Sequence, residues 1–438
     1  TKRVYPAGEV AANVLGFVGA DGVGLAGIEY ANEDVLAGVD GWKTFERGAA
    51  GPAIPTAEVT GDEPIPGQTI ALTIDRDLQY VAQRILENAV AESGSESGSI
   101  VVMDPRTGDI LALASAPTFD PNNPGAAEPN DLGNRALTDA FEPGSTTKVI
   151  TMAGVLEEGG AKPDTIFEIP PTLTRSGKVF HDATDHGGYT WDLTTVLSRS
   201  SNIGTILAAE TVGGDVLLDY LQRFGIGQPT GLGFPGETAG YLPPKDEWSG
   251  TTFPTLTFGQ GLSVNAVQVA SVFATIANDG VRLPARLVGG VTAADGVAVA
   301  IPVPEGTRVI SENTARQVRE MLEQVVVVGG TAPMAGIPGY RIGGKTGTAQ
   351  VINPECGCYE DATVGSFIGM APIESPELVI GVTFVRPTVQ QFGGELAGPV
   401  FREIMAYALQ ARQVAPITGP QTTSAQAAFA LRNDNDSD

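Results

Sequence analysis

The clearest hydrophobic pattern in the chain follows Asp75, where apolar residues recur at intervals of three and four up to Ser93. This spacing places them on one face of an α-helix. An aspartate directly before the first turn is typical of an N-cap, and the residues after Ser93 are polar and rich in glycine and serine. We therefore predict an amphipathic helix that begins after Asp75 and ends near Ser93.

Four short apolar runs predict β-strands. Residues 100–103 and 110–114 flank a turn-forming segment, which favours a β-hairpin. Residues 366–370 and 378–385 form a second pair, and their continuous apolar character predicts that both faces are buried. The expected strands therefore lie on either side of a long central segment.

Helical periodicity fills that central segment and the end of the chain. The predicted helices are residues 147–158, 193–210, 263–278, 312–327 and 399–412. A polar Ser-Ser-Asn connection interrupts the second of these segments. Strands, then helices, then strands indicate an α+β fold.

The two ends of the chain differ from the centre in composition. Residues 3–65 are rich in glycine and have no sustained period, so we predict a small, loop-rich module over residues 1–65. Residues 66–414 then form one large domain, and the polar, proline-containing residues 415–438 a disordered tail. The chain starts without a methionine, and we expect that an upstream part was removed.

Composition and charge narrow the class of protein. Apolar residues make up 42% of the chain and charged residues 18%, which is typical of a globular protein. A formal net charge of -25 would repel phosphate backbones and anionic lipid headgroups, so we expect no nucleic-acid partner. The sequence contains no apolar run near the roughly 18 residues that span a bilayer.

The cysteines and histidines give little sign of a metal site. Cys356 and Cys358 lie in a Cys-Gly-Cys segment without partners at zinc-ligand spacing. A local disulfide and two free thiols are both compatible with this segment. His181 and His186 share a short acidic stretch, but no further ligand is in view, so we predict a polar loop there. We expect neither a metal nor another cofactor.

Ser145 and Lys148 carry the first candidate chemistry. They lie one turn apart at the start of a predicted helix, so their side chains can meet. A serine hydroxyl is a weak nucleophile at neutral pH, and a lysine whose amine is kept neutral by burial or positive neighbours can activate it. For an isolated Ser-x-x-Lys, a serine N-cap with a solvated lysine is the favoured interpretation, because a chain of this length contains such matches by chance.

Ser200 and Asn202 form a second motif in the polar connection within residues 193–210. Their hydroxyl and amide groups can relay a proton and hold a substrate carbonyl. The pattern alone is weak, because residues 263–265 and 311–313 also read Ser-x-Asn. Those two segments precede helical periodicity, and we interpret them as helix caps.

The third motif is Lys345-Thr346-Gly347-Thr348. As a strand it places Lys345 and Gly347 on one face and the two threonines on the other. A strand glycine often marks the close approach of a ligand, although a plain polar edge strand is the alternative for this motif alone. The three motifs, in this order, match the set found in serine β-lactamases and penicillin-binding proteins. Together they predict acyl transfer to a serine.

With these motifs the sequence resembles the class B penicillin-binding proteins, and among them the division-specific, FtsI-like type (penicillin-binding protein 3) of actinobacteria. The resembling segments run along nearly the whole chain: 3–8, 24–29 and 36–41 for the non-catalytic pedestal, 141–145, 258–261 and 344–350 for the catalytic surroundings, and 353–359 for the actinobacterial branch. The resemblance implies a β-lactamase-like transpeptidase fold, with a five-stranded antiparallel sheet flanked by helices and a partial N-terminal pedestal module of the dimerisation type.

The resemblance also implies a role for each motif residue. Ser145 would be the acylated nucleophile, Lys148 its general base, and Ser200 a proton carrier. Asn202 would hold the substrate amide, and Lys345 would set the local potential. An oxyanion hole would come from backbone N–H groups of Ser145 and the last threonine of the third motif.

Thr346, Gly347 and Thr348 would then bind the terminal carboxylate of a peptidoglycan stem peptide that ends in D-Ala-D-Ala. The implied reaction is D,D-transpeptidation in septal cell-wall synthesis, with β-lactams as covalent inhibitors. The implied protein partners are a glycosyltransferase and other members of the division machinery. The implied location is the extracytoplasmic face of the plasma membrane, with an anchoring N-terminal helix that is absent from this chain.

Two other functions stay open on the sequence. A D,D-carboxypeptidase or β-lactamase shares the acylation step but transfers the acyl group to water, and we see no convincing equivalent of the deacylating glutamate of class A β-lactamases. A penicillin-recognising sensor or scaffold would bind without cross-linking, and the pedestal-like front part of the chain is compatible with it.

Overall fold

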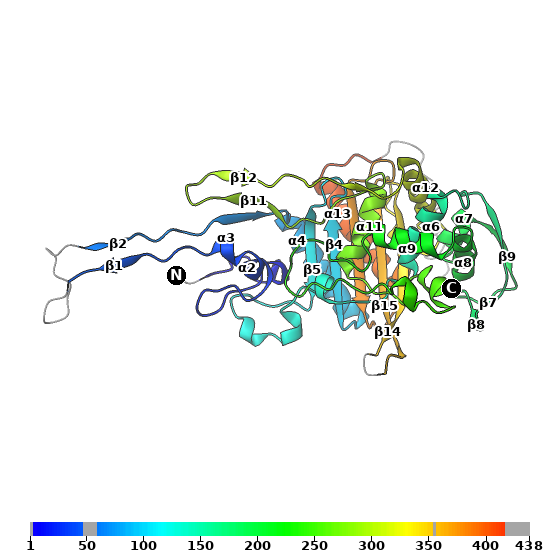
Figure 1. The fold of residues 1–438 in the computed structure, drawn as a ribbon, viewed down its shortest axis with the longest axis horizontal. Coiled ribbons are helices and arrows are strands. Elements are labelled where there is room, and N and C mark those ends of the chain that lie inside the picture. Colours follow the sequence, from blue (N-terminus) through cyan, green and yellow to red (C-terminus); the bar gives the residue numbers. More distant parts are fainter. Residues whose placement is uncertain (1–2, 47–58, 354–355, 417–438) are drawn as a thin grey trace, which may run out of the picture.

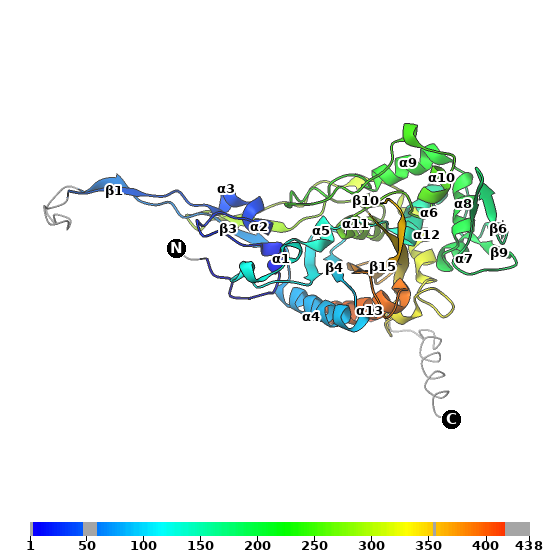
Figure 2. The same ribbon diagram turned by 90° about the horizontal axis from the view of Figure 1, so that it is seen from below.

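The structure is a computed structural model, and it describes residues 3–46, 59–353 and 356–416. The molecule is elongated (Figures 1 and 2). A body of helices around a central sheet forms one part, and long arms of paired strands project from one end of it. Within the described residues, no helix combines the length and apolar character needed to cross a membrane.

The central sheet has five antiparallel strands in the order β14-β15-β16-β4-β5. Their bounds are β4 (Ser97–Met103), β5 (Ile110–Ala116), β14 (Gly343–Ile352), β15 (Tyr359–Ala371) and β16 (Leu378–Val385). The sheet therefore joins the early hairpin to the late strands of the chain. The predicted α+β class and the five-stranded antiparallel sheet are confirmed.

Both faces of this sheet are covered by helices. Ile100 and Val102 of β4 belong to the apolar cluster with α4 (Arg76–Ser93) and α13 (Gly393–Ala411). The alternate residues Val101 and Met103 belong to the other cluster, with α6 (Lys148–Glu157) and α11 (Ala266–Ala277). Successive strand residues point to opposite faces, and burial of both faces explains why the strands read as continuous apolar runs.

Helix α4 begins and ends as predicted. The Asp75 carboxylate accepts the backbone N–H groups of Asp77 and Leu78, which have no partner within the helix. Gly94 follows the last residue, Ser93, in the left-handed conformation with φ 61°. Glycine adopts this conformation without a steric cost, so it ends the helix.

The other predicted helices are found with altered bounds. The segment 193–210 is divided into α7 (Leu193–Ser198) and α8 (Asn202–Glu210), as the polar connection predicted. Helix α12 (Glu312–Glu323) ends four residues early. The predicted start at Pro399 was wrong, because α13 runs through it from Gly393. Gly393 lies so close to the backbone of β14 and β15 that a Cβ would meet a carbonyl oxygen at 2.3 Å, and this packing outweighs the lost proline hydrogen bond.

The N-terminal part consists of short elements joined by loops. They are α1 (Ala12–Leu15), α2 (Gly27–Ala31), α3 (Glu33–Leu36), β1 (Trp42–Thr44), β2 (Thr60–Asp62) and β3 (Thr69–Leu72). Strand β3 pairs with β11 (Val288–Thr292), which pairs with β12 (Ala298–Ala300). The division of the chain at residue 65 stays a prediction, and nearly all of the tail 415–438 lies outside the described residues.

The end of the body opposite the arms is a helical lobe (Figure 1). It contains α6 to α8, α9 (Gly214–Arg223), α10 (Thr252–Leu256) and the small strands β6 (Ile166–Ile169), β7 (Leu173–Arg175), β8 (Lys178–Phe180) and β9 (Tyr189–Asp192). The remaining short elements are α5 (Arg135–Thr138), β10 (Val281–Arg282) and β13 (Thr307–Arg308). The first two sequence motifs lie at the ends of helices of this lobe, and the third lies in strand β14.

Candidate active site

Three segments that are far apart in the sequence meet at the edge of the sheet. Ser145 lies in the 3₁₀ turn η3 (Gly144–Thr147), which leads into α6 at Lys148. Strand β14 runs directly beside this turn: a Cβ on Gly347 would lie 3.1 Å from the carbonyl oxygen of Pro143. The absence of a side chain at Gly347 therefore lets the third motif approach the nucleophile turn.

Ser200 is the point where the motifs are joined. Its hydroxyl oxygen accepts a hydrogen bond from the Lys148 ammonium at 3.1 Å and another from the Lys345 ammonium at 2.9 Å. Lys148 belongs to the first motif, Ser200 to the second and Lys345 to the third. The side chains of all three motifs thus form one connected hydrogen-bond network.

Lys148 is buried, and each of the three N–H donors of its ammonium group has a neutral acceptor. Besides the Ser200 hydroxyl, its ammonium donates to the Ser200 carbonyl at 2.6 Å and to Asn202 Oδ1 at 2.7 Å. The expected direct hydrogen bond to Ser145 is not among the hydrogen bonds of the described residues. A buried ammonium needs all three of its donors paired, and in this structure Ser200 and Asn202 supply the partners. Catalytic hydrogen bonds often tighten only with substrate bound.

Burial strongly affects both lysines. It lowers the pKa of Lys345 to about 7. For Lys148, burial first and the neighbouring Lys345 charge second hold the pKa well below its usual range, while the Asp182 charge acts in the opposite direction. Two adjacent ammonium groups in a buried site disfavour each other's charge. The site therefore favours a neutral amine beside Ser200, as a general base requires.

The backbone of Ser200 is strained. Its φ is 61°, in the left-handed region that residues with a Cβ rarely adopt. Such conformations cost on the order of 1 kcal/mol or more, and they persist where the surrounding structure imposes them. Here the conformation lies between α7 and α8 and presents the Ser200 hydroxyl to both lysines.

The threonines of the third motif lie on the same face of β14, in agreement with the strand pattern. Thr346 Oγ1 is 3.1 Å from Thr331 Oγ1 and accepts from Lys345 Nζ at 3.3 Å. Thr348 is exposed, and its Oγ1 accepts the N–H of Gly393 at 3.2 Å. Hydroxyl groups next to a buried lysine are a suitable environment for a carboxylate.

The Phe-Gly-Gln-Gly segment supports the nucleophile turn. Gly144 donates its N–H to the carbonyl oxygen of Gly259 at 3.2 Å. Gly259 has φ 82°, and a Cβ there would lie 2.2 Å from the Gly144 carbonyl oxygen. Residues 258–261 therefore lie beside the nucleophile turn, in agreement with the resemblance of this segment to the catalytic surroundings of the family.

Glu142 and Tyr359 were missed in the sequence. The Glu142 carboxylate accepts the N–H of Gly261 at 2.7 Å and the hydroxyl of Tyr359 at 3.1 Å. Burial raises the pKa of Glu142, and burial together with the Glu142 charge raises the pKa of Tyr359 to about 12. Glu142 lies three residues before Ser145, which is the one signal that could have drawn attention to it.

The remaining sequence candidates are placed as follows. Cys356 and Cys358 form a disulfide with their Cα atoms 5.2 Å apart, which decides between the two states that the sequence left open. Among the described residues, no group of three or more histidine, cysteine and acidic side chains is placed to hold a metal ion. His186 lies against Asp182, at 3.3 Å between Nε2 and Oδ2.

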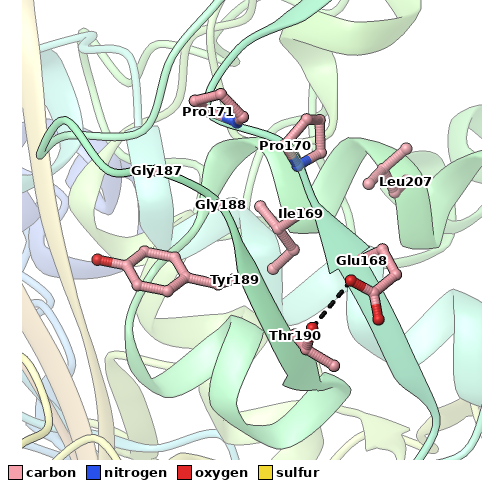
Figure 3. A pocket seen from close by; sticks show the side chains of 9 residues that line it. All are labelled: Glu168, Ile169, Pro170, Pro171, Gly187, Gly188, Tyr189, Thr190 and Leu207. Carbon is pink, nitrogen blue, oxygen red and sulfur yellow. Dashed lines mark hydrogen bonds between the residues drawn. The ribbon is translucent and has the colours of Figure 1, made fainter.

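A separate cavity of about 630 Å³ lies beside β6 and β9 (Figure 3). It is lined by Glu168, Ile169, Pro170, Pro171, Gly187, Gly188, Tyr189, Thr190 and Leu207. The three motifs lie outside this lining. The cavity is therefore distinct from the lysine and serine network.

Two family models match the chain. The model described as the penicillin binding protein transpeptidase domain matches residues 98–406, and it includes all three motifs. The model described as the penicillin-binding protein dimerisation domain matches residues 1–72.

Relatives of established name match along nearly the whole chain. The penicillin-binding protein PbpB of Mycolicibacterium smegmatis is 42% identical over 433 residues, which are 96% of this chain and 67% of the relative. The peptidoglycan D,D-transpeptidase FtsI of Escherichia coli K12 is 35% identical over 418 residues, which are 95% of this chain and 68% of FtsI. The chain thus spans about two thirds of the length of these relatives.

A solved structure has the same fold. Penicillin binding protein 3 of Mycobacterium tuberculosis, in its complex with aztreonam, superposes with a TM-score of 0.87 at 40% identity, covering 96% of this chain and 92% of that one. Together with the motif geometry and the transpeptidase match, this similarity shows that the chain belongs to the penicillin-binding protein transpeptidase family and resembles its FtsI-like members.

Proposed function

We propose that the protein is a peptidoglycan D,D-transpeptidase that forms an acyl-enzyme on Ser145 and serves septal cell-wall synthesis. The observation that carries the proposal is the meeting of Lys148 and Lys345 at the Ser200 hydroxyl, at 3.1 and 2.9 Å. Two buried amines around one hydroxyl provide a route along which a proton can move.

In this mechanism Ser145 Oγ attacks the carbonyl carbon of the penultimate D-alanine. The serine proton passes to the neutral amine of Lys148, and from there through Ser200 to the departing D-alanine nitrogen. The C–N bond breaks and an ester to Ser145 remains. An amine of a neighbouring stem peptide then attacks the ester and restores the serine hydroxyl.

Binding of the substrate carboxylate is assigned to Lys345, Thr346 and Thr348, with Gly347 allowing close approach. Asn202 would hold the substrate amide. The buried Lys345 amine and the Thr346 hydroxyl beside it support this assignment. We also propose β-lactams as covalent inhibitors, because the Mycobacterium tuberculosis relative is known in a complex with aztreonam.

The proposal extends to the place of action and to partners. We propose the extracytoplasmic face of the plasma membrane, an anchoring N-terminal helix outside this sequence, and contact with a glycosyltransferase and other division proteins. The location is supported by the FtsI relative, which is named a peptidoglycan D,D-transpeptidase and therefore acts on the cell wall. Fractionation of cells that express the full gene would test the location.

Penicillin labelling of the intact chain tests the function. We expect a covalent adduct on Ser145 in peptide mass spectra, its loss in Ser145→Ala, and its retention in Ser249→Ala, which changes an exposed serine outside the motifs. An adduct on any other residue would contradict the assignment.

The same material separates the alternative functions. Rapid loss of the label to water would favour a hydrolase. A stable label without turnover of a D-Ala-D-Ala-like thioester would favour a sensor or scaffold. Slow loss of the label with thioester turnover and transfer to an added amine supports the transpeptidase.

A further inference from the structure

Asp182 lies directly behind the Ser-Ser-Asn segment, and only 9% of its side chain is exposed. Its Oδ1 accepts the backbone N–H groups of Asn202 at 2.5 Å and of Ile203 at 3.0 Å. Its Oδ2 accepts the hydroxyl of Ser201 at 2.7 Å. One carboxylate thus pairs with three donors at the first turn of α8, although it comes from a different loop.

His186 holds this carboxylate from the other side. Its Nδ1 accepts the N–H of Gly188 at 3.1 Å, so in the neutral ring the proton lies on Nε2, which faces Asp182 Oδ2 at 3.3 Å. The ring stacks on Tyr189 at 4.3 Å, and Tyr189 stacks on Trp191 at 4.0 Å. Figure 3 shows the Tyr189 ring pointing away from the Glu168 and Leu207 side of the cavity. The histidine is therefore held in one orientation.

The same loop also holds the Asn202 side chain. Asn202 Nδ2 donates to the carbonyl oxygen of His181 at 3.1 Å, which leaves Oδ1 to accept the Lys148 ammonium at 2.7 Å. Residues 181 and 182 thereby fix both the backbone and the amide orientation of Asn202. The position of the Lys148 amine depends on this arrangement.

The negative charge of Asp182 is a second link between this residue and Lys148, besides the hydrogen bonds. The charged or titratable side chains near Asp182 and Asn202 include Lys148, Lys345 and His186, with Tyr189 stacked on the His186 ring and His181 and Asp185 in the same loop. Burial and Lys345 lower the pKa of Lys148, and the Asp182 charge raises it. Asp182 is thus the negative charge that counters the positive charges at Ser200.

We propose that Asp182 is a positioning residue of this active site, which holds Asn202 and Ser201 against Lys148 and acts on the Lys148 amine through its negative charge. The inference rests on the proposed function, because it requires Lys148 to act as the base for Ser145. A plain helix N-cap would satisfy the backbone donors of α8 and have no effect on the chemistry.

The test is the pH dependence of the acylation rate with a fluorescent penicillin. In Asp182→Asn the charge is lost, so Lys148 releases its proton more readily and the acidic limb of the profile moves to lower pH. The amide also presents N–H groups to existing donors, so we expect the maximal rate to fall roughly ten- to a hundredfold. Asp185→Asn, an exposed neighbour in the same loop, is the matched control and should behave as wild type.

Two further variants separate charge from geometry. Asp182→Glu keeps the charge but displaces the carboxylate oxygens. The acidic limb of its pH profile should therefore stay in place, while its maximal acylation rate falls. His186→Gln removes the imidazole that contacts Asp182, and the acidic limb of its pH profile should also stay in place if Lys148 is the titrating base. Melting curves of each variant identify losses caused by unfolding, and Asp182→Glu carries the test if Asp182→Asn does not fold.

The proposal would be overturned if folded Asp182→Asn kept the acidic limb of the wild-type pH profile, or if Asp182→Glu acylated at the wild-type rate. A wild-type chain that never acylates Ser145 would instead refute the proposed function. The two failures are therefore distinguishable.

Discussion

Arg319 in α12 and Lys148 in the active site are both buried cations, but their hydrogen-bond partners differ. Arg319 in α12 donates to the Asp279 carboxylate at 2.7 Å and to the Ile276 carbonyl oxygen at 2.9 Å. Lys148, which is also buried, donates only to the hydroxyl, carbonyl and amide oxygens of Ser200 and Asn202. Burial alone therefore does not distinguish a structural cation from a catalytic one, whereas the partners do.

A direct carboxylate partner stabilises the charged form of a cation, and an arginine keeps its proton in any case. Neutral acceptors stabilise an ammonium less, so burial and a second positive charge can remove its proton. Asp182, whose negative charge acts on Lys148, hydrogen-bonds to Ser201 and the α8 backbone rather than to the amine. This arrangement keeps Lys148 positioned without locking it in the charged form.

The largest expected effect is on the acylation rate, when the catalytic cation Lys148 is removed. Lys148→Met should lower the acylation rate by about 10²–10⁴-fold, because the serine loses its base. Removing the poorly solvated Lys148 charge stabilises the fold, while the Ser200 carbonyl and Asn202 Oδ1 lose their donor, so these two effects on the unfolding free energy oppose each other and the net change should be about 1 kcal/mol. Penicilloylation kinetics by mass spectrometry and urea unfolding measure the two quantities.

The matched control for that variant is Arg319→Met, which removes the structural cation. It should keep the acylation rate and lose stability, because the Ile276 carbonyl oxygen loses its donor. Normal penicilloylation of Lys148→Met would refute the role of Lys148 as base.

The second effect concerns stability and pH. Folding lowers the pKa of Lys345 to about 7, while an unfolded lysine titrates near 10.4. Between these values the unfolded chain binds more protons, so stability rises with pH, by on the order of 1 kcal/mol per pH unit from this group. Lys345→Met should flatten this slope, whereas the exposed Lys162→Met should keep it. Urea unfolding from pH 7 to 9.5 measures it, and equal slopes would contradict the argument.

The smallest expected effect comes from changing Asp279, the carboxylate partner of the structural cation Arg319. Asp279 is half exposed, with 52% of its side chain accessible, so Asp279→Asn should cost about 1 kcal/mol or less. Its φ of 50° suits asparagine, which limits the loss further. The pH profile of acylation should not move, in contrast to Asp182→Asn. A shifted limb in Asp279→Asn would mean that the two regions are electrically coupled.

The features of this protein that depend on neighbouring residues along the chain could be predicted from its sequence. Asp75 and Gly94 bound helix α4 because capping depends on neighbouring residues. The apolar runs at 100–103 and 378–385 are strands because burial of both faces leaves a continuous pattern. The order of the three motifs indicated a serine acyl-transfer site, since each motif is a short local signature.

Only the tertiary structure decided how these pieces meet. Ser200, rather than Ser145, receives both lysines, and one of these contacts spans 145 residues of chain. Asp182 caps a helix from another loop, Tyr359 reaches Glu142 across 217 residues, and α13 continues through Pro399. A sequence pattern records which neighbours a residue has along the chain. The acceptors of a buried ammonium are set by packing in space, which no local pattern contains.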